Sequence, residues 1–577
     1  MTRNVLAINP GHNGSAALVC DGKLELYIEE ERMSRAKYDG NPFKAMMHII
    51  ERYRIDELVI AGTGQENHRL PWTGEDSYGA LVRKYHPNVQ IMRVGAYHHD
   101  GHAYSAFYNS GFETAAALIV DGSGSIFKFR FSERDEDSID AFETESIYKC
   151  SYDEIKPVYK IGANNGIPTI ESPNSEVGGS VTTVKAYEAV SEYLGFGFIE
   201  AGKTMGLAPY GRPDKNIPNL FYEDSGKGDK NVLIPHYPAG AFIDEKTISY
   251  LRRPEGFYNW HRDASKVTDA AKNLAWKVQQ ETQERVGDLI EKAVDMTGEE
   301  NIVISGGYGL NCVANYYFKE RFPELNIFID PVAHDGGTSI GWAKRRYFEG
   351  NKDGERDPLT TLYLGPKYEY TVEDLENFED LEVSDADSVS IAKLISEKNI
   401  VAMFQGRAEA GPRALGNRSI LYDPTDINGK DFVNTVKGRE WFRPFAGTVL
   451  KEHAKEWFDL RGMDETPYMM YAVELQSKAI GELPSITHVD GTCRVQTVTE
   501  EQNKHYYDLI SEFHKLSGVP VLFNTSFNLA GEPLVEDLKD AIHTLRSSKI
   551  EYLYFPELGK LVTLKNVEET VEETTEE

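Results

Sequence analysis

A short apolar run that leads directly into a glycine-containing turn recurs along this chain and limits its fold more than any other feature. Such runs are typical of buried strands. Turns without a Cβ atom let backbone N–H groups approach phosphate oxygens closely. The recurrence therefore predicts a sheet-based fold with a nucleotide site. The clearest instances are Val5–Ile8 before Gly11, Ala115–Val120 before Gly122, and Asn301–Ser305 before Gly306 and Gly307.

The length of 577 residues predicts two or three separate cores, because one hydrophobic core rarely organises so long a chain. Apolar patterning weakens after residue 351 and resumes at Ser388. We therefore expect a first domain over residues 1–360, a linker over 361–387 and a second domain over 388–564. Residues 565–577 are acidic and are expected to form a disordered tail.

Composition excludes several classes of protein. Aromatic residues make up 11% of the chain, which excludes a largely disordered protein. The formal net charge of −30 excludes a general affinity for nucleic acid but permits a local basic groove. The four cysteines are far apart, which argues against a disulfide scaffold and fits a reducing compartment. Because no signal-peptide pattern and no long apolar run is found, we expect a cytoplasmic protein with no membrane partner.

Two histidines four residues apart, His98 and His102, form the first candidate site. On a helix this spacing places both imidazoles on one face, about one turn apart, as a divalent metal requires. Asp335, at a glycine turn before a predicted helix, is a candidate third ligand. Imidazoles with one carboxylate suit Fe(II), Zn or Mn. The alternative is a surface or capping histidine cluster without a metal.

The turn after the first strand, residues 11–15, permits two interpretations. Its Asn13-Gly14 pair is typical of a plain β-hairpin turn. In the other interpretation, His12 projects into a cleft and accepts the proton of an acceptor hydroxyl, since a neutral imidazole is suited to general-base catalysis near pH 7. The residues alone leave both interpretations open.

A basic, glycine-rich segment lies in the predicted second domain. Three arginines alternate with glycines over residues 406–419, and a second basic group follows over 437–443. Guanidinium groups bind phosphate through paired hydrogen bonds and stabilise charge on a transferring group. The amide and hydroxyl side chains over residues 524–528 can orient a small planar group such as a carbamoyl. A solvated basic face and a capped strand end are the respective alternatives.

Taken together, these segments resemble the O-carbamoyltransferases of the nodulation and antibiotic-tailoring type. The resemblance covers nearly the whole chain, from Val5 to about Leu545. Two positions depart from the family pattern: Asn13 stands where an aspartate is frequent, and Tyr38 stands where a histidine is frequent. The motifs that carry the resemblance are GHNGSAAL, EEERMSR, HHDGHAYSAFY, AGKTMGLAPYG, ISGGYGLN, GRAEAGPRALGNRS, KGREWFRPFA and PVLFNTSFN.

The resemblance implies an α/β fold in two parts. The N-terminal part is similar to the protein that transfers threonylcarbamoyl groups to tRNA, with an actin-like (ASKHA) two-lobed ATPase fold. The C-terminal part is similar to its YrdC-like partner, an α/β domain that makes carbamoyl adenylates. The second domain would join carbamoyl phosphate and ATP into carbamoyl-adenylate. The first would transfer the carbamoyl group to an acceptor hydroxyl, with a divalent metal, Fe(II) or else Mg or Mn, at the intermediate.

The resemblance also implies roles for individual residues. The metal ligands would be His98, His102 and Asp335, and His12 would be the base at the acceptor. Nucleotide-binding residues of the first domain would be Asp121, Gly122, Lys203, Gly306, Gly307 and Asn311. Carbamoyl phosphate would be held by Arg413, Arg418, Lys437, Arg443, Asn524 and Ser526, and the two arginines at the head of this set would be catalytic.

The acceptor stays open at this point. A small natural product or sugar and 5-hydroxymethylcytosine in DNA are the two candidates. DNA modification would need a basic lip near His12, for which Arg32, Arg35 and Lys37 are available. The alternatives to a carbamoyltransferase are an actin-fold kinase, a threonylcarbamoyl-type tRNA-modifying enzyme and an actin-like assembly protein. A homodimer is also left open.

Overall fold

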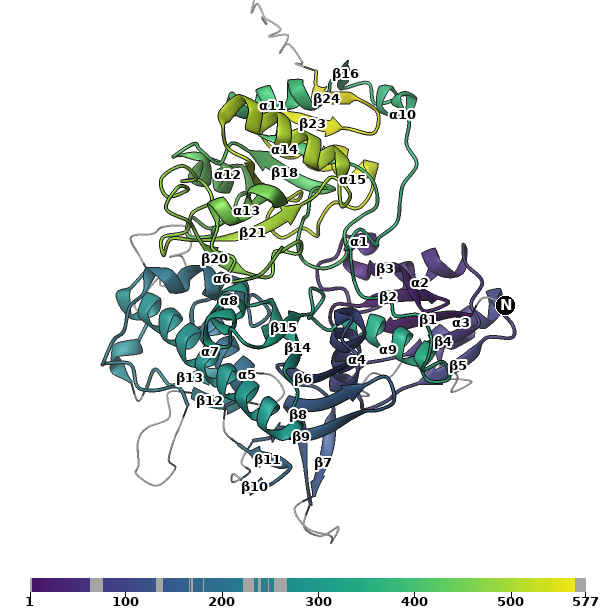
Figure 1. Cartoon of the computed structure of the whole chain (residues 1–577), viewed down its shortest axis with the longest axis vertical. Helices are drawn as coiled ribbons and strands as arrows, with labels where there is room; N and C mark the ends of the chain where they lie inside the picture. Colours follow the sequence, from purple (N-terminus) through teal and green to yellow (C-terminus); the bar gives the residue numbers. More distant parts are fainter. Residues whose placement is uncertain are drawn as a thin grey trace, which may run out of the picture.

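Three large sheets organise the part of the chain that the structure describes. The computed structural model covers residues 3–62, 76–130, 138–165, 167, 170–179, 181–221, 233–236, 240–246, 248–253 and 267–565. Within these residues the sheets have five, eight and nine strands. Figure 1 shows two lobes side by side, with the C-terminal domain above them. Of the expected acidic tail over 565–577, all but Lys565 lies outside the described residues.

The first sheet has the strand order β3-β2-β1-β4-β5. Two hairpins make β1, β2 and β3 antiparallel, whereas β4 and β5 continue parallel to β1. Helices α2 and α3 pack on its outer face, so the apolar strands predicted here are buried on both sides. The bounds are β1 (Asn4–Asn9), β2 (Ser15–Cys20), β3 (Lys23–Glu29), α1 (Glu30–Ser34), α2 (Phe43–Ile50), β4 (Glu57–Ile60), α3 (Ser77–Tyr85) and β5 (Gln90–Arg93).

The second sheet repeats this order as β9-β8-β6-β14-β15. Here too the first three strands are antiparallel, and β14 and β15 lie parallel to β6. The two lobes thus have the same strand order. This is the actin-like arrangement that the resemblance implied, so this part of the predicted fold is confirmed. The strand bounds are β6 (Thr114–Val120), β7 (Ile126–Arg130), β8 (Ser138–Ser151), β9 (Ile155–Ala163), β10 (Ile170–Ser172), β11 (Ser175–Gly178), β12 (Leu233–His236), β13 (Gly240–Ile243), β14 (Asn301–Ser305) and β15 (Asn326–Ile329).

Helices cover both faces of this second sheet. The outer face packs against α5 and α7, whose apolar residues share a core with β6 and β14. Two further helices, α6 and α8, lie toward the C-terminal domain (Figure 1). The helix bounds are α4 (His98–Ser110), α5 (Thr183–Tyr193), α6 (Ala201–Leu207), α7 (Asp269–Thr297), α8 (Cys312–Arg321) and α9 (Gly337–Phe348).

Helices α4 and α9 lie between the two lobes. Helix α9 packs on β1 and β2, helix α4 packs on β6 and β14, and the two helices pack on each other. They approach closely because glycines meet at their crossing: a Cβ atom on Gly341 would overlap the carbonyl oxygen of Gly101. This contact brings the first turn of α4 next to the loop that precedes α9.

The C-terminal domain is a mixed α/β unit around the order β16-β24-β23-β17-β18-β22-β19-β21-β20, as predicted for an α/β domain. Segment 361–387, expected to be a linker, also supplies β16 at the sheet edge. The bounds are α10 (Val372–Glu376), β16 (Leu381–Asp385), α11 (Ser388–Ser396), β17 (Val401–Phe404), β18 (Arg418–Tyr422), α12 (Gly429–Lys437), β19 (Ala446–Leu450), α13 (Lys451–Trp457), β20 (Ala472–Glu474), β21 (Thr492–Val498), α14 (Lys504–Ser517), β22 (Val521–Ser526), α15 (Leu538–Arg546), β23 (Tyr552–Phe555) and β24 (Lys560–Leu564). Among all the described helices, none combines the length and apolar composition that crossing a lipid bilayer requires.

Candidate active site

A cavity of about 660 Å³ lies where the two lobes meet the C-terminal domain. Its lobe wall includes the turn after β1, the start of α4, the turn after β6 and helix α6, and its other wall includes residues before β18, on β21 and at the end of β22. A cavity of this size between domains is where a substrate site is expected. The predicted residues that line it are His12, His98, Asp121, Gly122, Lys203, Gly307, Asn311, Asp335, Arg413, Arg443, Asn524 and Ser526.

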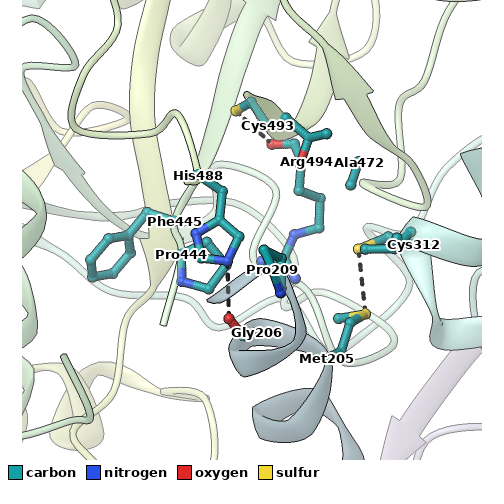
Figure 2. Close-up of a pocket in the computed structure, with 12 residues that line it drawn as sticks. Met205, Gly206, Pro209, Cys312, Pro444, Phe445, Ala472, His488, Cys493 and Arg494 are labelled. Carbon is teal, nitrogen blue, oxygen red and sulfur yellow. Dashed lines mark hydrogen bonds between the residues drawn. The ribbon is translucent and has the colours of Figure 1, made fainter. Parts of the chain in front are cut away.

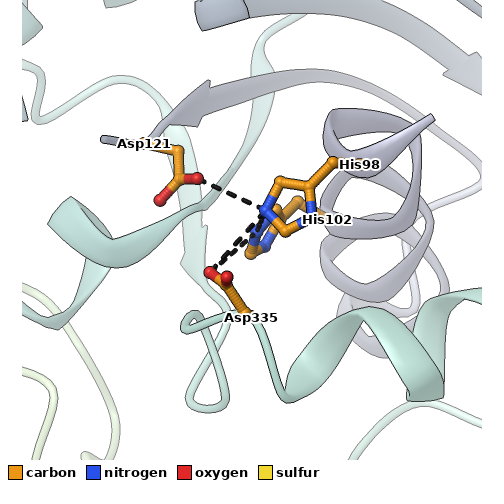
Figure 3. A group of neighbouring side chains, drawn as sticks. All are labelled: His98, His102, Asp121 and Asp335. Carbon is orange, nitrogen blue, oxygen red and sulfur yellow. Dashed lines mark hydrogen bonds and ion pairs between the residues drawn. The ribbon is translucent and has the colours of Figure 1, made fainter. Parts of the chain in front are cut away.

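Four side chains form a compact cluster on the lobe wall (Figure 3). His98 and His102 extend from α4, Asp121 follows β6 and Asp335 precedes α9; one ligand atom of each lies within 4.8 Å of the others. The Nε2 atom of His98 lies 3.4 Å from Asp121 Oδ2 and 3.6 Å from Asp335 Oδ1. The Nε2 atom of His102 lies 3.2 Å from that of His98 and 3.8 Å from Asp335 Oδ1. Two imidazoles and two carboxylates thus surround one point, as a divalent cation requires.

Neighbouring groups orient this cluster and give it a negative field. The Nδ1 atom of His102 lies 3.2 Å from the Ser305 hydroxyl, which lies 3.4 Å from Asp330 Oδ2; such contacts fix the orientation of a ligand ring. Burial opposes charge on His98, but Asp335 and Asp121 raise its pKa well above its ordinary value. The cluster therefore stabilises positive charge at its centre.

Asp121 has a larger part in this cluster than the sequence indicated. It was expected to line a phosphate cleft, and the structure places it among the candidate metal ligands. Its Oδ1 atom accepts a hydrogen bond of 3.2 Å from the Gly307 N–H. Gly306 does not line the cavity itself; its φ of 88° shapes the turn, and a Cβ atom there would overlap the Val120 backbone. The Asp-Gly pair directly after a buried strand was the signal that could have revealed this ligand.

His12 projects into the cavity from the turn between β1 and β2. Its Nε2 atom lies 3.9 Å from Asp335 Oδ2, and its side chain is 48% exposed. The next residue, Asn13, has a φ of 59°, which an asparagine in a hairpin turn tolerates. Both interpretations of this turn are therefore compatible with the structure: it is a hairpin, and it holds an imidazole beside the four-residue cluster.

Three further predicted residues line the cavity between the lobes. Asn311 caps α8, and its Nδ2 donates 3.0 Å to Gln279 Oε1. Gly122 sits so close to Glu188 that a Cβ atom would overlap the carboxylate. Lys203 is paired at 2.8 Å with Glu200 and at 2.9 Å with Glu440 of the C-terminal domain. Its ammonium therefore joins α6 to that domain.

Four arginines gather on the C-terminal wall, and we call them the arginine cluster: Arg413, Arg439, Arg443 and Arg494. Arg413 and Arg443 were predicted as binding residues; Arg439 and Arg494 were not. Burial and the neighbouring charges of Arg494 and Arg443 lower the pKa of Arg413 to about 9. Burial and the same kind of repulsion, from Arg443 and Arg494, lower the pKa of Arg439 well below its ordinary value. A bound anion would relieve this repulsion, so the cluster has the properties of a phosphate site.

The arginine cluster also holds donors without partners. Among the described residues, no hydrogen-bond acceptor is within reach of the buried Nε atoms of Arg413, Arg439 and Arg494. Figure 2 shows Arg494 extending from the C-terminal domain toward Cys312 and Met205 of the lobes. Unpartnered buried donors are rare in folded proteins and here indicate a ligand with acceptor oxygens.

Polar groups at the end of β22 complete this wall. The Nδ2 atom of Asn524 donates to Thr448 Oγ1 at 3.0 Å, which leaves its buried Oδ1 without a partner among the described residues. That oxygen can accept a hydrogen bond from an amide N–H. Ser526 donates at 2.6 Å to Asn528 Oδ1. Lys437, which was predicted to hold carbamoyl phosphate, does not line the cavity; it donates to the Ser526 carbonyl and, at 3.1 Å, to Asn528, and so shapes this wall from behind.

Arg418 does not line the cavity, although it was predicted to bind carbamoyl phosphate. Its side chain is fully buried and lies 3.7 Å from the Phe404 ring centre. The guanidinium donates at 2.5 Å to the carbonyl of Gln405 and at 3.1 Å to that of Glu536. These bonds connect β17, β18 and the segment before α15, which is a structural role.

Replacing Arg418 with methionine should therefore lower stability. We expect the free energy of unfolding to fall by about 3–5 kcal/mol, because the buried carbonyls of Gln405 and Glu536 lose their hydrogen-bond donor and the buried Glu536 carboxyl loses a neighbouring positive charge. Urea unfolding followed by tryptophan fluorescence measures this. Arg494→Met is the matched control and should leave the midpoint unchanged or raised. Equal losses in both variants would contradict the structural role.

Fold and site together define an α/β enzyme in which two clusters of side chains lie on opposite walls of one cavity. The arginine cluster has the properties of a phosphate site, and the cluster of two histidines and two aspartates has those of a metal site. Two family models match the sequence: "Carbamoyltransferase N-terminus" over residues 74–344 and "Carbamoyltransferase C-terminus" over 392–560. The chain belongs to the carbamoyltransferase family and is an enzyme that transfers carbamoyl groups.

The relatives agree with this assignment. Nodulation protein NolNO of Sinorhizobium fredii is 30% identical over 94% of this chain and 78% of the relative. Nodulation protein U of Rhizobium tropici is 32% identical over 92% of each chain. The 3'-hydroxymethylcephem-O-carbamoyltransferase of Amycolatopsis lactamdurans is 25% identical over 93% of this chain and 95% of the relative. Among solved structures, full-length HypF is a distant likeness, with 12% identity and a TM-score of 0.32 over 60% of this chain and 55% of that chain.

Proposed function

We propose that this protein is an ATP-dependent O-carbamoyltransferase that forms carbamoyl-adenylate from carbamoyl phosphate and ATP and passes the carbamoyl group to an acceptor hydroxyl. One observation carries the proposal: a single cavity has the arginine cluster on one wall and the cluster of two histidines and two aspartates on the other. The first suits phosphate chemistry, and the second suits polarisation of a carbonyl group.

The arginine cluster would serve the first half of the reaction. Water cleaves carbamoyl phosphate to carbamate and inorganic phosphate. A carbamate oxygen then attacks the α-phosphorus of ATP, and pyrophosphate leaves as carbamoyl-adenylate forms. Arg413, Arg439, Arg443 and Arg494 neutralise the charge that builds on the phosphoryl oxygens. The free Oδ1 atom of Asn524 accepts a hydrogen bond from the carbamoyl amide and orients it.

The lobe wall would serve the second half. The acceptor hydroxyl oxygen attacks the carbamoyl carbon, its proton passes to His12 Nε2, and the bond to the adenylate oxygen breaks so that AMP leaves. Gly122, Gly307 and Asn311, which line the cavity beside Asp121, would contact the nucleotide. Lys203 would hold α6 against the C-terminal domain through Glu440 during this step.

The donors at this wall fit a divalent metal. Two imidazole nitrogens and two carboxylates suit Fe(II), Zn or Mn, and we propose Fe(II). Bound by His98, His102, Asp121 and Asp335, the ion would supply Lewis-acid polarisation of the carbamoyl carbonyl.

A small hydroxylated molecule fits the acceptor side better than DNA. The arginines expected to form a basic lip are engaged within the protein: Arg32 donates at 2.6 Å to the Gly411 carbonyl, and Arg35 donates at 2.7 Å to that of Leu534. Lys37 remains exposed beside the Tyr38 ring. A relative acts on the hydroxymethyl group of a cephem, and we propose an acceptor of that kind, a natural product or a sugar.

An acceptor screen tests the proposed function. The purified enzyme, ATP, carbamoyl phosphate and a divalent metal would be combined with a hydroxymethyl cephem, with amino sugars, or with duplex DNA that contains 5-hydroxymethylcytosine. Mass spectrometry should find a carbamate ester on a small molecule, formed only when ATP is present. A carbamoylated base in DNA would overturn the acceptor class. A phosphorylated hydroxyl with release of ADP would overturn the proposed reaction.

Replacing His12 with alanine should separate the two halves of the reaction. We expect transfer to fall by about 10²–10⁴-fold because the hydroxyl loses its base, while carbamoyl-adenylate formation stays within about two-fold. Pyrophosphate release without acceptor and carbamoylated product with acceptor are the two measurements. A parallel fall of both rates would remove His12 from the role of base.

A further inference from the structure

Helix α1 connects the lobes to the C-terminal domain through Arg32. The side chain is 4% exposed, and its guanidinium donates at 3.3 Å to the carbonyl of Glu409 and at 2.6 Å to that of Gly411. Gly411 lies two residues before Arg413. Arg32 thus holds the backbone of the loop that supplies a member of the arginine cluster. Figure 1 shows α1 at the face of the first lobe that meets the C-terminal domain.

The same guanidinium is also linked, through Glu29 and His334, to the loop that carries Asp335. Its terminal nitrogen lies 3.1 Å from Glu29 Oε2, and Glu29 Oε1 lies 3.0 Å from His334 Nε2. His334 directly precedes Asp335, and its Nδ1 accepts a 3.1 Å hydrogen bond from the Gly336 N–H. Burial disfavours the Glu29 carboxylate, but Arg32 and His334 hold its pKa at about 2, so it stays charged. Direct contacts therefore run from the Asp335 loop through Glu29 and Arg32 to the Arg413 loop.

We propose that Arg32 is a positioning residue that keeps the two half-sites in register, so that carbamoyl-adenylate formed at the arginine cluster reaches His12 without leaving the cavity. The inference rests on the proposed function and assigns a task to the EEERMSR segment. A guanidinium suits this task because its planar fork can hold two carbonyl groups and one carboxylate at once. Without the Arg32 guanidinium, the loop that carries Asp335 and the loop that carries Arg413 can shift relative to each other. Small shifts of catalytic groups have large kinetic effects.

Arg35 offers a matched control on the same segment. It donates at 2.7 Å to the Leu534 carbonyl and at 3.0 Å to the Pro533 carbonyl, and it lies 3.3 Å from Asp540. These contacts also cross to the C-terminal domain, but they run away from the Glu29–His334 pair. Arg35→Met therefore removes a domain contact of the same kind, together with a 3.4 Å hydrogen bond to the Arg32 carbonyl, and leaves the side-chain contacts of Arg32 intact.

The test follows acceptor-free turnover with ATP and carbamoyl phosphate as the only substrates. In the wild type we expect a burst of about one pyrophosphate per enzyme and then slow AMP release, because the adenylate stays in the cavity. In Arg32→Met the burst should persist within about two-fold while steady AMP release rises at least about ten-fold. Glu29→Gln breaks the chain at its next contact and should behave in the same way. Arg35→Met should keep the wild-type pattern.

The outcomes separate this inference from the proposed function. A wild type without a burst would overturn the proposed function itself. A normal wild-type burst with unchanged AMP release in both Arg32→Met and Glu29→Gln would overturn the positioning role alone. So would a burst lost in both variants, since Arg32 would then be needed for adenylate formation. Thermal melting within a few degrees of wild type confirms that the variants are folded.

Discussion

Replacing Arg413 with alanine should abolish carbamoyl-adenylate formation, with a fall of about 10³-fold or more in the rate of pyrophosphate release. The side chain lines the cavity, lies among three other arginines, and has a buried Nε without a partner among the described residues. Its pKa of about 9 shows how strongly burial and the neighbouring charges of Arg494 and Arg443 destabilise its charged form in the free protein. The phosphate oxygens of the substrates would offset that penalty, so Arg413 is suited to bind them and to stabilise the charge that builds during the reaction.

The stability of this variant provides the control. Because Arg413→Ala removes one of several mutually repelling charges, the free energy of unfolding should stay the same or rise. Arg418→Ala, five residues away in sequence but buried in hydrogen bonds to backbone carbonyls, should instead destabilise the domain. Normal adenylate formation by Arg413→Ala would show that the arginine cluster is not the phosphate site.

Replacing Asp335 with alanine should impair carbamoyl transfer and leave carbamoyl-adenylate formation nearly unchanged, the opposite of what we expect for Arg413→Ala. This carboxylate lies 3.6 Å from His98 Nε2 and 3.8 Å from His102 Nε2, and it completes the cluster from the turn that precedes α9. We expect metal affinity to fall by about 10²-fold or more, and carbamoyl transfer to fall with it. Adenylate formation should remain within about two-fold, because the arginine cluster is untouched.

Metal content by mass spectrometry and calorimetric titration with Fe(II), Zn and Mn measure the first effect, and the two partial reactions measure the second. Asp121→Asn is an informative companion, since the amide keeps the Oδ1 that accepts from Gly307 but loses the charge toward His98. It should weaken the metal less than Asp335→Ala. Full metal affinity in Asp335→Ala would contradict the assignment of the cluster.

Parts of this site could be predicted from the sequence wherever the residues that form them lie close together in the chain. His98 and His102 lie one helical turn apart, so their shared face followed from the 3.6-residue period. The Asp-Gly pair after a buried strand marks Asp121 as a candidate polar group at a strand end, but its place beside the two histidines depends on the pairing of β6 with β14 and on the contact of two helices at Gly101 and Gly341.

The arginine cluster, too, could be predicted only in part from the sequence. Residue type and glycine content predicted a phosphate-binding segment, but they could not tell which side chains face the cavity. Arg418 begins a buried strand and points into the domain, whereas Arg494 lies on β21, more than fifty residues from Arg439, and reaches the cavity only through the fold of the third sheet. The repeated strand order of the two lobes could be expected only from the family resemblance and not from local patterns, since it is set by pairings between strands far apart in the chain.

The most direct test of the account is to detect carbamoyl-adenylate. Isotopically labelled carbamoyl phosphate, ATP, a divalent metal and the enzyme would be incubated without acceptor, quenched rapidly and analysed by mass spectrometry. The account predicts labelled carbamoyl-adenylate together with an equal amount of pyrophosphate, and neither with Arg413→Ala. The release of ADP without pyrophosphate, or consumption of carbamoyl phosphate in the presence of ATP with neither carbamoyl-adenylate nor pyrophosphate formed, would contradict it.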